Sequence, residues 1–204
     1  MWSNHAYMKK STLFVFACAC ALTFTGCKNE KTEKTDSPDT DTLVTTQVAD
    51  STIWGHLGED TGMSTLQFIT DQGDTLEVYR TNPYTGEDGA LLGEIRNYTD
   101  RFAMTLTAGG ETLGKAINTT QLTRTWKSES GRVDIKADGS ITSADHTYNG
   151  WKVWNGHLLL SSQQKQEIGT VQRIDTLDII HLSADSLIIL NPLTKHFFRL
   201  YNPI

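Results

Sequence analysis

After Ser51, apolar and polar residues alternate along most of the chain, and this period of two restricts the fold more than any other feature of the sequence. Residues that alternate in this way place their apolar side chains on one face of a β-strand. In the clearest case, runs 64–70 and 74–80 flank the turn residues Asp71-Gln72-Gly73, which predicts an antiparallel hairpin. The side chains expected to face one another across it are Leu66, Phe68, Leu76 and Val78. Residues 51–120 carry no helical stripe, so we expect strands throughout.

A second series of strands begins near Leu122. Residues 150–154 and 157–160 flank Asn155-Gly156, which is the strongest short hairpin signal because both residues accept a positive φ. Further strand-like runs follow closely at residues 176–182, 185–190 and 196–201. Such close spacing is typical of an up-and-down barrel or a sandwich, so the sequence predicts an all-β fold.

The second series also resembles a known family. The motifs that carry the resemblance are Trp126, 133–139 (VDIKADG), 148–152 (YNGWK), 157–160 (HLLL), 175–179 (DTLDI) and 185–189 (DSLII). Together they are similar to the lipocalin-like lipoprotein domain common in Bacteroides, over residues ~121–202. Arg124 stands where many lipocalins have the glycine of a Gly-x-Trp opening. These are turn and core motifs, so the resemblance implies a fold and carries almost no chemistry.

The preceding segment, residues 51–120, has about five strand-like runs, enough for a small antiparallel barrel of the oligonucleotide/oligosaccharide-binding (OB-like) type. We therefore expect this barrel to be followed by a lipocalin-like up-and-down β-barrel in residues 121–204, with one continuous barrel as the alternative. Such a pair is similar to envelope-stress lipoproteins implicated in copper resistance. Their Cys-x-x-Cys motif is absent from this sequence, so the resemblance does not extend to thiol-based copper or redox sensing.

The N-terminus has the pattern of a signal peptide in residues 1–26. Lys9 and Lys10 precede an apolar run of about a dozen residues that ends near Phe24, which is short of the roughly 20 needed to cross a bilayer. Because export signals usually begin with basic residues, Met8 is the natural start. A permanent transmembrane helix is the alternative.

Gly26-Cys27 resembles the lipobox of bacterial lipoproteins of the Bacteroidetes type. The resemblance implies cleavage before Cys27, a diacylglyceryl cysteine acylated by fatty acids such as palmitate, and anchoring in a membrane of the cell envelope. The outer membrane is expected, with a periplasmic or surface-exposed face left open. Ala19-Cys20-Ala21 as an ordinary cleavage site and residues 15–18 as a degenerate lipobox are the competing interpretations.

Residues 27–50 are expected to be a disordered tether, because no apolar residue occurs between Cys27 and Leu43. Loss of Lys9 and Lys10 with the leader lowers the formal charge from −6 to −8. An acidic chain of this kind argues against nucleic acid as a partner.

The sequence offers no catalytic residues, no metal site and no cofactor motif. Cys27 is the single cysteine after the leader, the histidines are not paired at metal-ligand spacing, and Gly-x-Ser-x-Gly does not occur. We therefore expect a protein that is not an enzyme.

The aromatic residues carry the ligand-binding hypothesis. Trp126, Tyr148 and Trp151 are candidates to line a barrel interior that binds a small hydrophobic or glycan ligand, and Trp154 lies on the opposite face of the strand that carries Trp151. The alternative is that they fill the core, because an eight-stranded barrel is just wide enough for side chains. Two function classes follow: a membrane-anchored lipoprotein that binds such a ligand, and a structural or envelope-stress sensory module that docks on another envelope protein.

Overall fold

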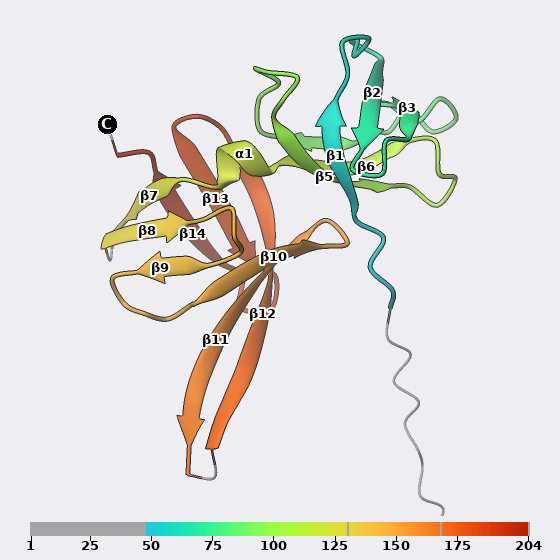
Figure 1. Cartoon of the computed structure of the whole chain (residues 1–204). Coiled ribbons are helices and arrows are strands. Elements are labelled where there is room, and N and C mark those ends of the chain that lie inside the picture. The colour runs from blue at the N-terminus through green and yellow to red at the C-terminus, as the bar shows by residue number, and fades with distance from the viewer. Residues whose placement is uncertain (1–47, 130, 168, 204) are drawn as a thin grey trace, which may run out of the picture. The chain divides into compact units, whose positions relative to one another are not determined.

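The computed structural model describes residues 48–129, 131–167 and 169–203, and these are nearly all in strands or turns (Figure 1). The all-β prediction is therefore confirmed. The first six strands are β1 (Ile53–Leu57), β2 (Thr65–Thr70), β3 (Thr75–Tyr79), β4 (Ala90–Leu92), β5 (Arg101–Leu106) and β6 (Leu113–Asn118). After helix α1 (Thr119–Leu122) come β7 (Thr125–Ser128), β8 (Gly131–Ile135), β9 (Ile141–Ser143), β10 (Gly150–Trp154), β11 (His157–Gln166), β12 (Gly169–Leu182), β13 (Ser186–Asn191) and β14 (His196–Tyr201).

The predicted leader with its start at Met8, the lipidation site Cys27 and most of the predicted tether lie outside the described residues. No helix within the described ranges is both long and apolar enough to cross a membrane. Both sheets belong to one compact unit, residues 46–204, and its division into domains 51–120 and 121–204 stays a prediction.

The first sheet has the strand order β3-β2-β1-β5-β6-β4. The predicted hairpin is confirmed in its register, since Leu66 pairs with Val78 and Phe68 with Leu76. β4 is only three residues long, because Gly93 takes a φ of 97° and leaves the extended conformation.

This sheet is mixed, which corrects the expectation of a purely antiparallel small barrel. β4 runs parallel to β6, and Tyr79 at the end of β3 forms a parallel bridge with Thr112 just before β6. The direction follows from the strand order: β3 and β6 are each two antiparallel pairings away from β1, so both run in the same direction as β1. The first sheet therefore curls until β3 and β6 meet at one parallel bridge, and we call this partly closed sheet the first barrel.

Large side chains fill the inside of the first barrel. Its buried cluster contains Leu57, Leu66, Phe68, Val78, Phe102, Met104, Leu113 and Ala116. Packing is close enough that a Cβ at Gly55, in the middle of β1, would lie 2.1 Å from the Ile69 carbonyl oxygen and 2.8 Å from the Phe68 ring. The backbone of β1 can approach Phe68 only because residue 55 has no side chain.

Helix α1 connects the two sheets and was not expected from the sequence, because four residues are too few to show a helical period. The Asn118 side chain caps it by accepting a hydrogen bond from the backbone N–H of Gln121 at 2.9 Å. The indole of Trp126, the second residue of β7, donates to the Leu122 carbonyl at 3.0 Å. The turn of helix thus fixes the start of the second sheet.

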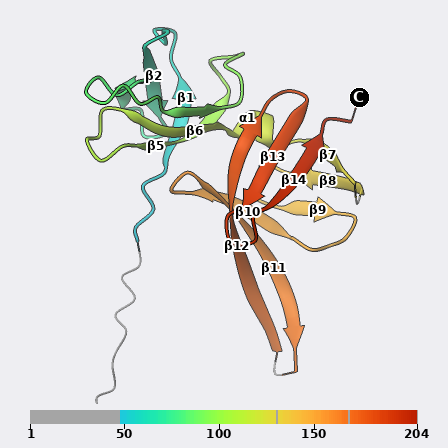
Figure 2. The same ribbon diagram turned by 180° about the vertical axis from the view of Figure 1, so that it is seen from behind.

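The second sheet places its strands in chain order, β7 to β14, with β14 pairing back to β7 at Tyr201 and Lys127. Figure 2 shows β14 beside β7. A bridge between Ser140 and Gly150 joins the remaining edges, β9 and β10. This is the predicted up-and-down antiparallel barrel. Its Asn155-Gly156 turn has positive φ angles at both residues, 48° and 75°, as the hairpin signal requires.

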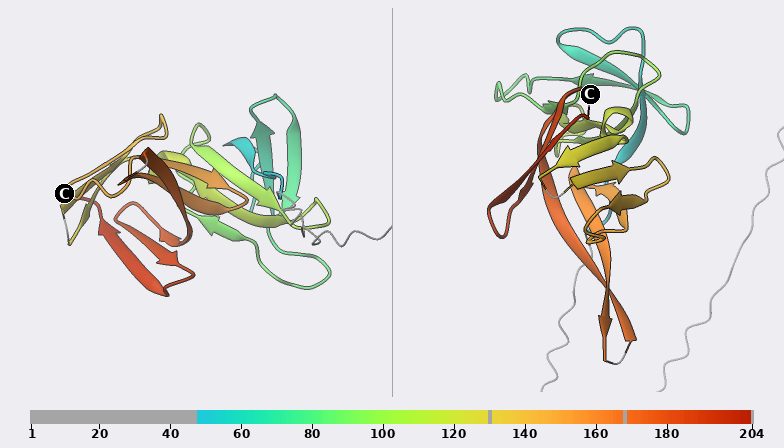
Figure 3. Two further views of the ribbon diagram at one scale, coloured as in Figure 1. Left: turned by 90° about the horizontal axis from the view of Figure 1, so that it is seen from below. Right: turned by 90° about the vertical axis from the view of Figure 1, so that its left-hand side faces the viewer.

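Hairpin β11–β12 is much longer than the sequence analysis expected. β11 continues to Gln166 and β12 starts at Gly169, whereas β10 pairs with β11 only as far as Ser161. The hairpin consequently projects from the barrel, as the right-hand view of Figure 3 shows. Residues 161–166 (SSQQKQ) were missed because polar side chains on both faces leave no alternation to detect.

Hydrogen bonds connect the start of the first barrel to the turn between β10 and β11. The Asn155 side-chain oxygen accepts from the Ser51 backbone N–H at 2.6 Å and from the Ser51 hydroxyl at 2.7 Å, and its amide donates to the Ala49 carbonyl at 3.0 Å. The chain that leads out of the predicted tether is therefore held against the second barrel.

Candidate ligand-binding site

The second barrel encloses an open hollow of about 640 Å³. Its aliphatic lining comes from β8, β9, β11, β12, β13 and β14: Val133, Ile135, Ile141, Leu158, Leu160, Leu177, Ile189 and Leu200. On β8, successive side chains point to opposite faces of the sheet. Val133 and Ile135 therefore face the hollow, whereas Arg132 and Asp134 form an ion pair with each other at 2.9 Å. β14 contributes all of residues 196–200, with Phe197, Phe198 and Leu200 as its apolar members. The apolar side chains of these strands therefore surround one space.

The polar lining of the hollow comes from two places: Ser143, Asp145 and Tyr148 at the end of β9 and on the loop after it, and Ser128, Glu129, His196 and Arg199 at the end of β7, on the turn after it and on β14. The carboxylate of Asp145 accepts hydrogen bonds from the Ser143 hydroxyl and from the backbone N–H of Thr147, and these bonds hold the pKa of Asp145 below its usual value. Ser143 and Asp145 both line the hollow. A mainly apolar space with a few polar groups is the usual form of a small-molecule site.

Tyr148 is the predicted ligand-binding residue that lines this hollow. It is half-buried, and its hydroxyl donates to the Asp175 carboxylate on β12 at 2.8 Å. Burial, followed by this hydrogen bond, raises the pKa of Tyr148 to about 12. The phenol therefore stays protonated at neutral pH and ties the loop before β10 to β12.

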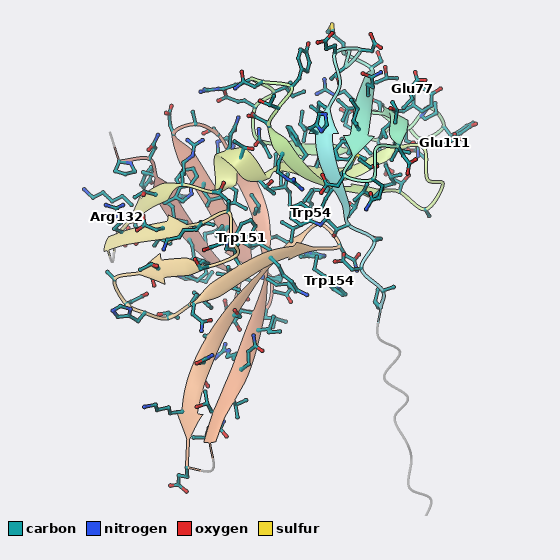
Figure 4. All side chains as sticks on the ribbon, in the orientation of Figure 1. Trp54, Glu77, Glu111, Arg132, Trp151 and Trp154 are labelled. Carbon is teal, nitrogen blue, oxygen red and sulfur yellow. The ribbon has the colours of Figure 1, made fainter. Side chains whose placement is uncertain are left out.

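The three candidate tryptophans are not among the residues that line the hollow. Trp126 is completely buried in the core, with the Arg124 guanidinium 5.4 Å from the centre of its ring. Trp151 packs against the same core and donates from its indole to the Lys136 carbonyl at 2.8 Å. Trp154 lies at the other end of β10 and is half-buried; Figure 4 shows both residues along this strand. Whether any of them binds a ligand stays a prediction.

Comparison with known proteins agrees with this geometry. A family model described as lipocalin-like matches residues 120–200, which is the second barrel with α1. The match supports a lipocalin-like domain. Neither the curated proteins nor the solved structures gave a match to this chain. The resemblance to lipoproteins of Bacteroides stays a prediction.

Arg124, which replaces the glycine of the Gly-x-Trp opening, donates to the Ala184 carbonyl at 2.9 Å and so has a structural role at the base of the lipocalin-like barrel.

A second hollow of about 320 Å³ adjoins the first at Tyr148, which lines both. Its other lining residues are His146, Thr147, Ser162, Gln163, Gln164, Arg173 and Asp175. They come from the loop between β9 and β10 and from the projecting part of hairpin β11–β12. We call this second hollow the polar groove and the first one the lumen of the lipocalin-like barrel.

Among the described residues, no group of three or more histidine, cysteine, aspartate or glutamate side chains is placed to hold a metal ion. His157 instead pairs with Asp178 at 2.7 Å, and Lys115 of β6 lies 3.7 Å from the same carboxylate. These contacts connect the two sheets and give His157 a structural role.

Sequence reasoning missed the aliphatic residues that form the lumen because it looked for a site among aromatic residues. The signal was present in the alternation: Val133 and Ile135, and then Leu158 and Leu160, are pairs separated by one residue on predicted strands. The sequence contains no such signal for the polar groove, because Ser162 and Gln164 belong to a part of β11 that was not predicted to be a strand.

Proposed function

We propose that this protein is a membrane-anchored, non-enzymatic lipoprotein of the cell envelope whose lipocalin-like barrel binds a small molecule with an apolar body. The observation that carries the proposal is the lumen, an open space of about 640 Å³ lined mainly by apolar side chains. Burial of apolar ligand surface there is favourable by about 25 cal/mol per Å². A lining of valine, isoleucine and leucine suits an alkyl or terpenoid chain better than a bare glycan, which would need more polar groups.

Ligand binding can be tested with N-phenyl-1-naphthylamine, whose fluorescence rises in an apolar environment. Val133 is half-buried at the wall of the lumen, so Val133→Trp should fill part of the space and weaken binding at least about tenfold. Val171→Trp is the matched control, because Val171 is exposed on the projecting hairpin and does not line the lumen. Absence of dye binding by the unaltered protein, or equal binding by the two variants, would overturn the proposal.

The anchor is a separate part of the proposal and rests on Gly26-Cys27 and the apolar run before it. In cells fed a radiolabelled or clickable palmitate, the unaltered chain should take up label and fractionate with membranes. Cys27→Ser should lose both properties, with Cys20→Ser as the control for the competing cleavage site. Label that persists in Cys27→Ser would show that the anchor lies elsewhere.

The outer face of the second barrel favours a second candidate function, docking on another envelope protein. On β14, Tyr201 is 53% exposed and does not line the lumen, whereas Phe197 is 51% exposed and also belongs to the lumen lining; Phe197 pairs with Leu190 of β13. Exposed aromatic residues next to apolar neighbours are typical of contact surfaces. A photo-crosslinking amino acid at residue 201, which lies outside the lumen, should then give a discrete crosslinked product in cells, whereas the same amino acid at Gln172 should not; no product at residue 201 would remove this candidate.

A further inference from the structure

The polar groove and the lumen are two unlike spaces that meet at Tyr148. Tyr148 separates them, with the aliphatic wall of the lumen on one side and the projecting hairpin on the other. Asp145 lines the lumen, and the next two residues of the same loop, His146 and Thr147, line the groove. A molecule that enters the lumen with its apolar end would therefore leave its other end beside the groove.

Several hydrogen-bonding groups of the groove have no protein partner within the described part of the chain. Ser162 is only 7% exposed as a residue, and its hydroxyl makes no hydrogen bond to another described residue; because no buried side-chain polar atom in the described ranges lacks a partner, this hydroxyl is open to the groove. The amides of Gln163 and Gln164 are likewise without a partner there. The Ser162 hydroxyl and the two amides are therefore free to exchange water for hydrogen bonds with a ligand group.

The charges of the groove cancel when histidine is counted as neutral. Arg173 and Asp175 lie two residues apart on β12 and form an ion pair at 2.9 Å, while Tyr148 donates to the other oxygen of the same carboxylate. Asp175 would repel a phosphate or carboxylate, and Arg173 would repel an ammonium group. What remains is a set of hydroxyls and amides that both donate and accept hydrogen bonds, which suits an uncharged head rich in hydroxyl groups.

We propose that the ligand is a neutral amphiphile, with its apolar tail in the lumen and a sugar-like polyhydroxyl head in the polar groove. This inference rests on the proposed function of the lumen and specifies the class of ligand that the lumen would take. It also gives the long hairpin a role, because the residues beyond Ser161 that project from the barrel supply Ser162, Gln163 and Gln164 to the groove.

The test compares amphiphiles that share a ten-carbon tail. Isothermal titration calorimetry below the micelle-forming concentrations would use decyl-β-D-maltoside, 1-decanol, decanoate and decylphosphocholine. We expect the maltoside to bind at least about tenfold more tightly than the alcohol, because two or more additional hydrogen bonds each contribute about 1 kcal/mol. Decanoate and decylphosphocholine should show no such gain.

Two glutamines of the hairpin give a matched pair of variants. Gln164 lines the groove, whereas Gln172 lies on the neighbouring strand outside it. Gln164→Ala should weaken binding of decyl-β-D-maltoside about three- to tenfold and leave 1-decanol unchanged. Gln172→Ala should change neither, and Ser162→Ala should behave like Gln164→Ala.

The possible results separate the two proposals. Selective loss of the maltoside preference in Gln164→Ala supports the inference. Equal binding of maltoside and alcohol, insensitive to Gln164→Ala, would overturn it and leave the apolar lumen standing as the ligand site. Tighter binding of decanoate or decylphosphocholine would overturn the neutral head. If none of the four probes binds, and the naphthylamine dye does not bind either, both the inference and the proposed function are wrong.

Discussion

Both sheets return on themselves, but the interior of the first barrel is filled and the interior of the second is hollow. The first returns on itself around Phe68, Phe102 and Met104, all of them completely buried, whereas the second closes through eight strands around shorter aliphatic side chains and retains a lumen of about 640 Å³. Because the diameter of a barrel grows with strand number, fewer strands and larger side chains leave little space, and more strands with smaller side chains leave a hollow. The difference supports the proposal that the second barrel binds a ligand, whereas the first is filled by its own side chains.

Deletion of a buried leucine should show the largest difference between them. Leu66 is completely buried in the filled core, so Leu66→Ala should lower the free energy of unfolding by about 3–4 kcal/mol, through lost burial and the cavity that remains. Chemical denaturation measures this value. Leu193→Ala is the control, since Leu193 is 90% exposed and its loss should cost less than about 0.5 kcal/mol. A loss below about 1.5 kcal/mol for Leu66→Ala would mean that the first barrel is not closely packed.

The same deletion in the second barrel should cost less. Leu160 already lines the lumen, so Leu160→Ala enlarges an existing space and leaves fewer contacts to lose; we expect about 1–2 kcal/mol. The same denaturation experiment gives the value, and the difference from Leu66→Ala is the quantity of interest. Equal losses at the two leucines would contradict the comparison between a filled and a hollow barrel.

The contrast between interiors could be anticipated from the sequence only in part. Alternation correctly predicted the all-β class and the register of the β2–β3 hairpin, and the Asn155-Gly156 pair correctly predicted a hairpin turn. Each of these features depends on residues close in the chain. The parallel closure of the first barrel was missed, since it joins Tyr79 to Thr112, and no local pattern records such a pairing. Whether a side chain lines a space or fills it depends on all eight strands together, so Tyr148 and Trp126 looked alike in sequence and differ in the structure.

The connection between the barrels gives the next prediction. Asn155 holds Ser51 and Ala49 through three side-chain hydrogen bonds, and it also has a positive φ. Asn155→Gly keeps this φ accessible and removes the bonds, so stability should fall by about 1 kcal/mol. Because Ala103 and Ile117 of the first sheet belong to the buried cluster of the second, we expect both barrels to unfold in one transition before and after the change. Calorimetry that resolves two transitions in the unaltered protein would show independent barrels.

The smallest expected effect concerns Tyr148, the residue between the lumen and the polar groove. Its pKa is raised from 10.0 to about 12 in the folded chain, so the neutral phenol is favoured by folding. That stabilisation is fully present below pH 10 and is lost as the pH rises from 10 to 12, because the folded barrel then keeps a proton that the unfolded chain has released. Partial exposure of the ring to solvent reduces the contribution to about 1 kcal/mol.

Tyr148→Phe removes the titrating group and therefore tests this assignment directly. Denaturation of the variant between pH 9 and 12 should show a shallower loss of stability than the unaltered protein, by about 1 kcal/mol over that interval. Tyr84→Phe is the control, because Tyr84 is 92% exposed and should leave the pH profile unchanged. Identical profiles for Tyr148→Phe and the unaltered protein would mean that the bond to Asp175 does not hold the phenol in its protonated form. The wall between the hollow interior of the second barrel and its polar groove would then be less rigid than the packed interior of the first barrel.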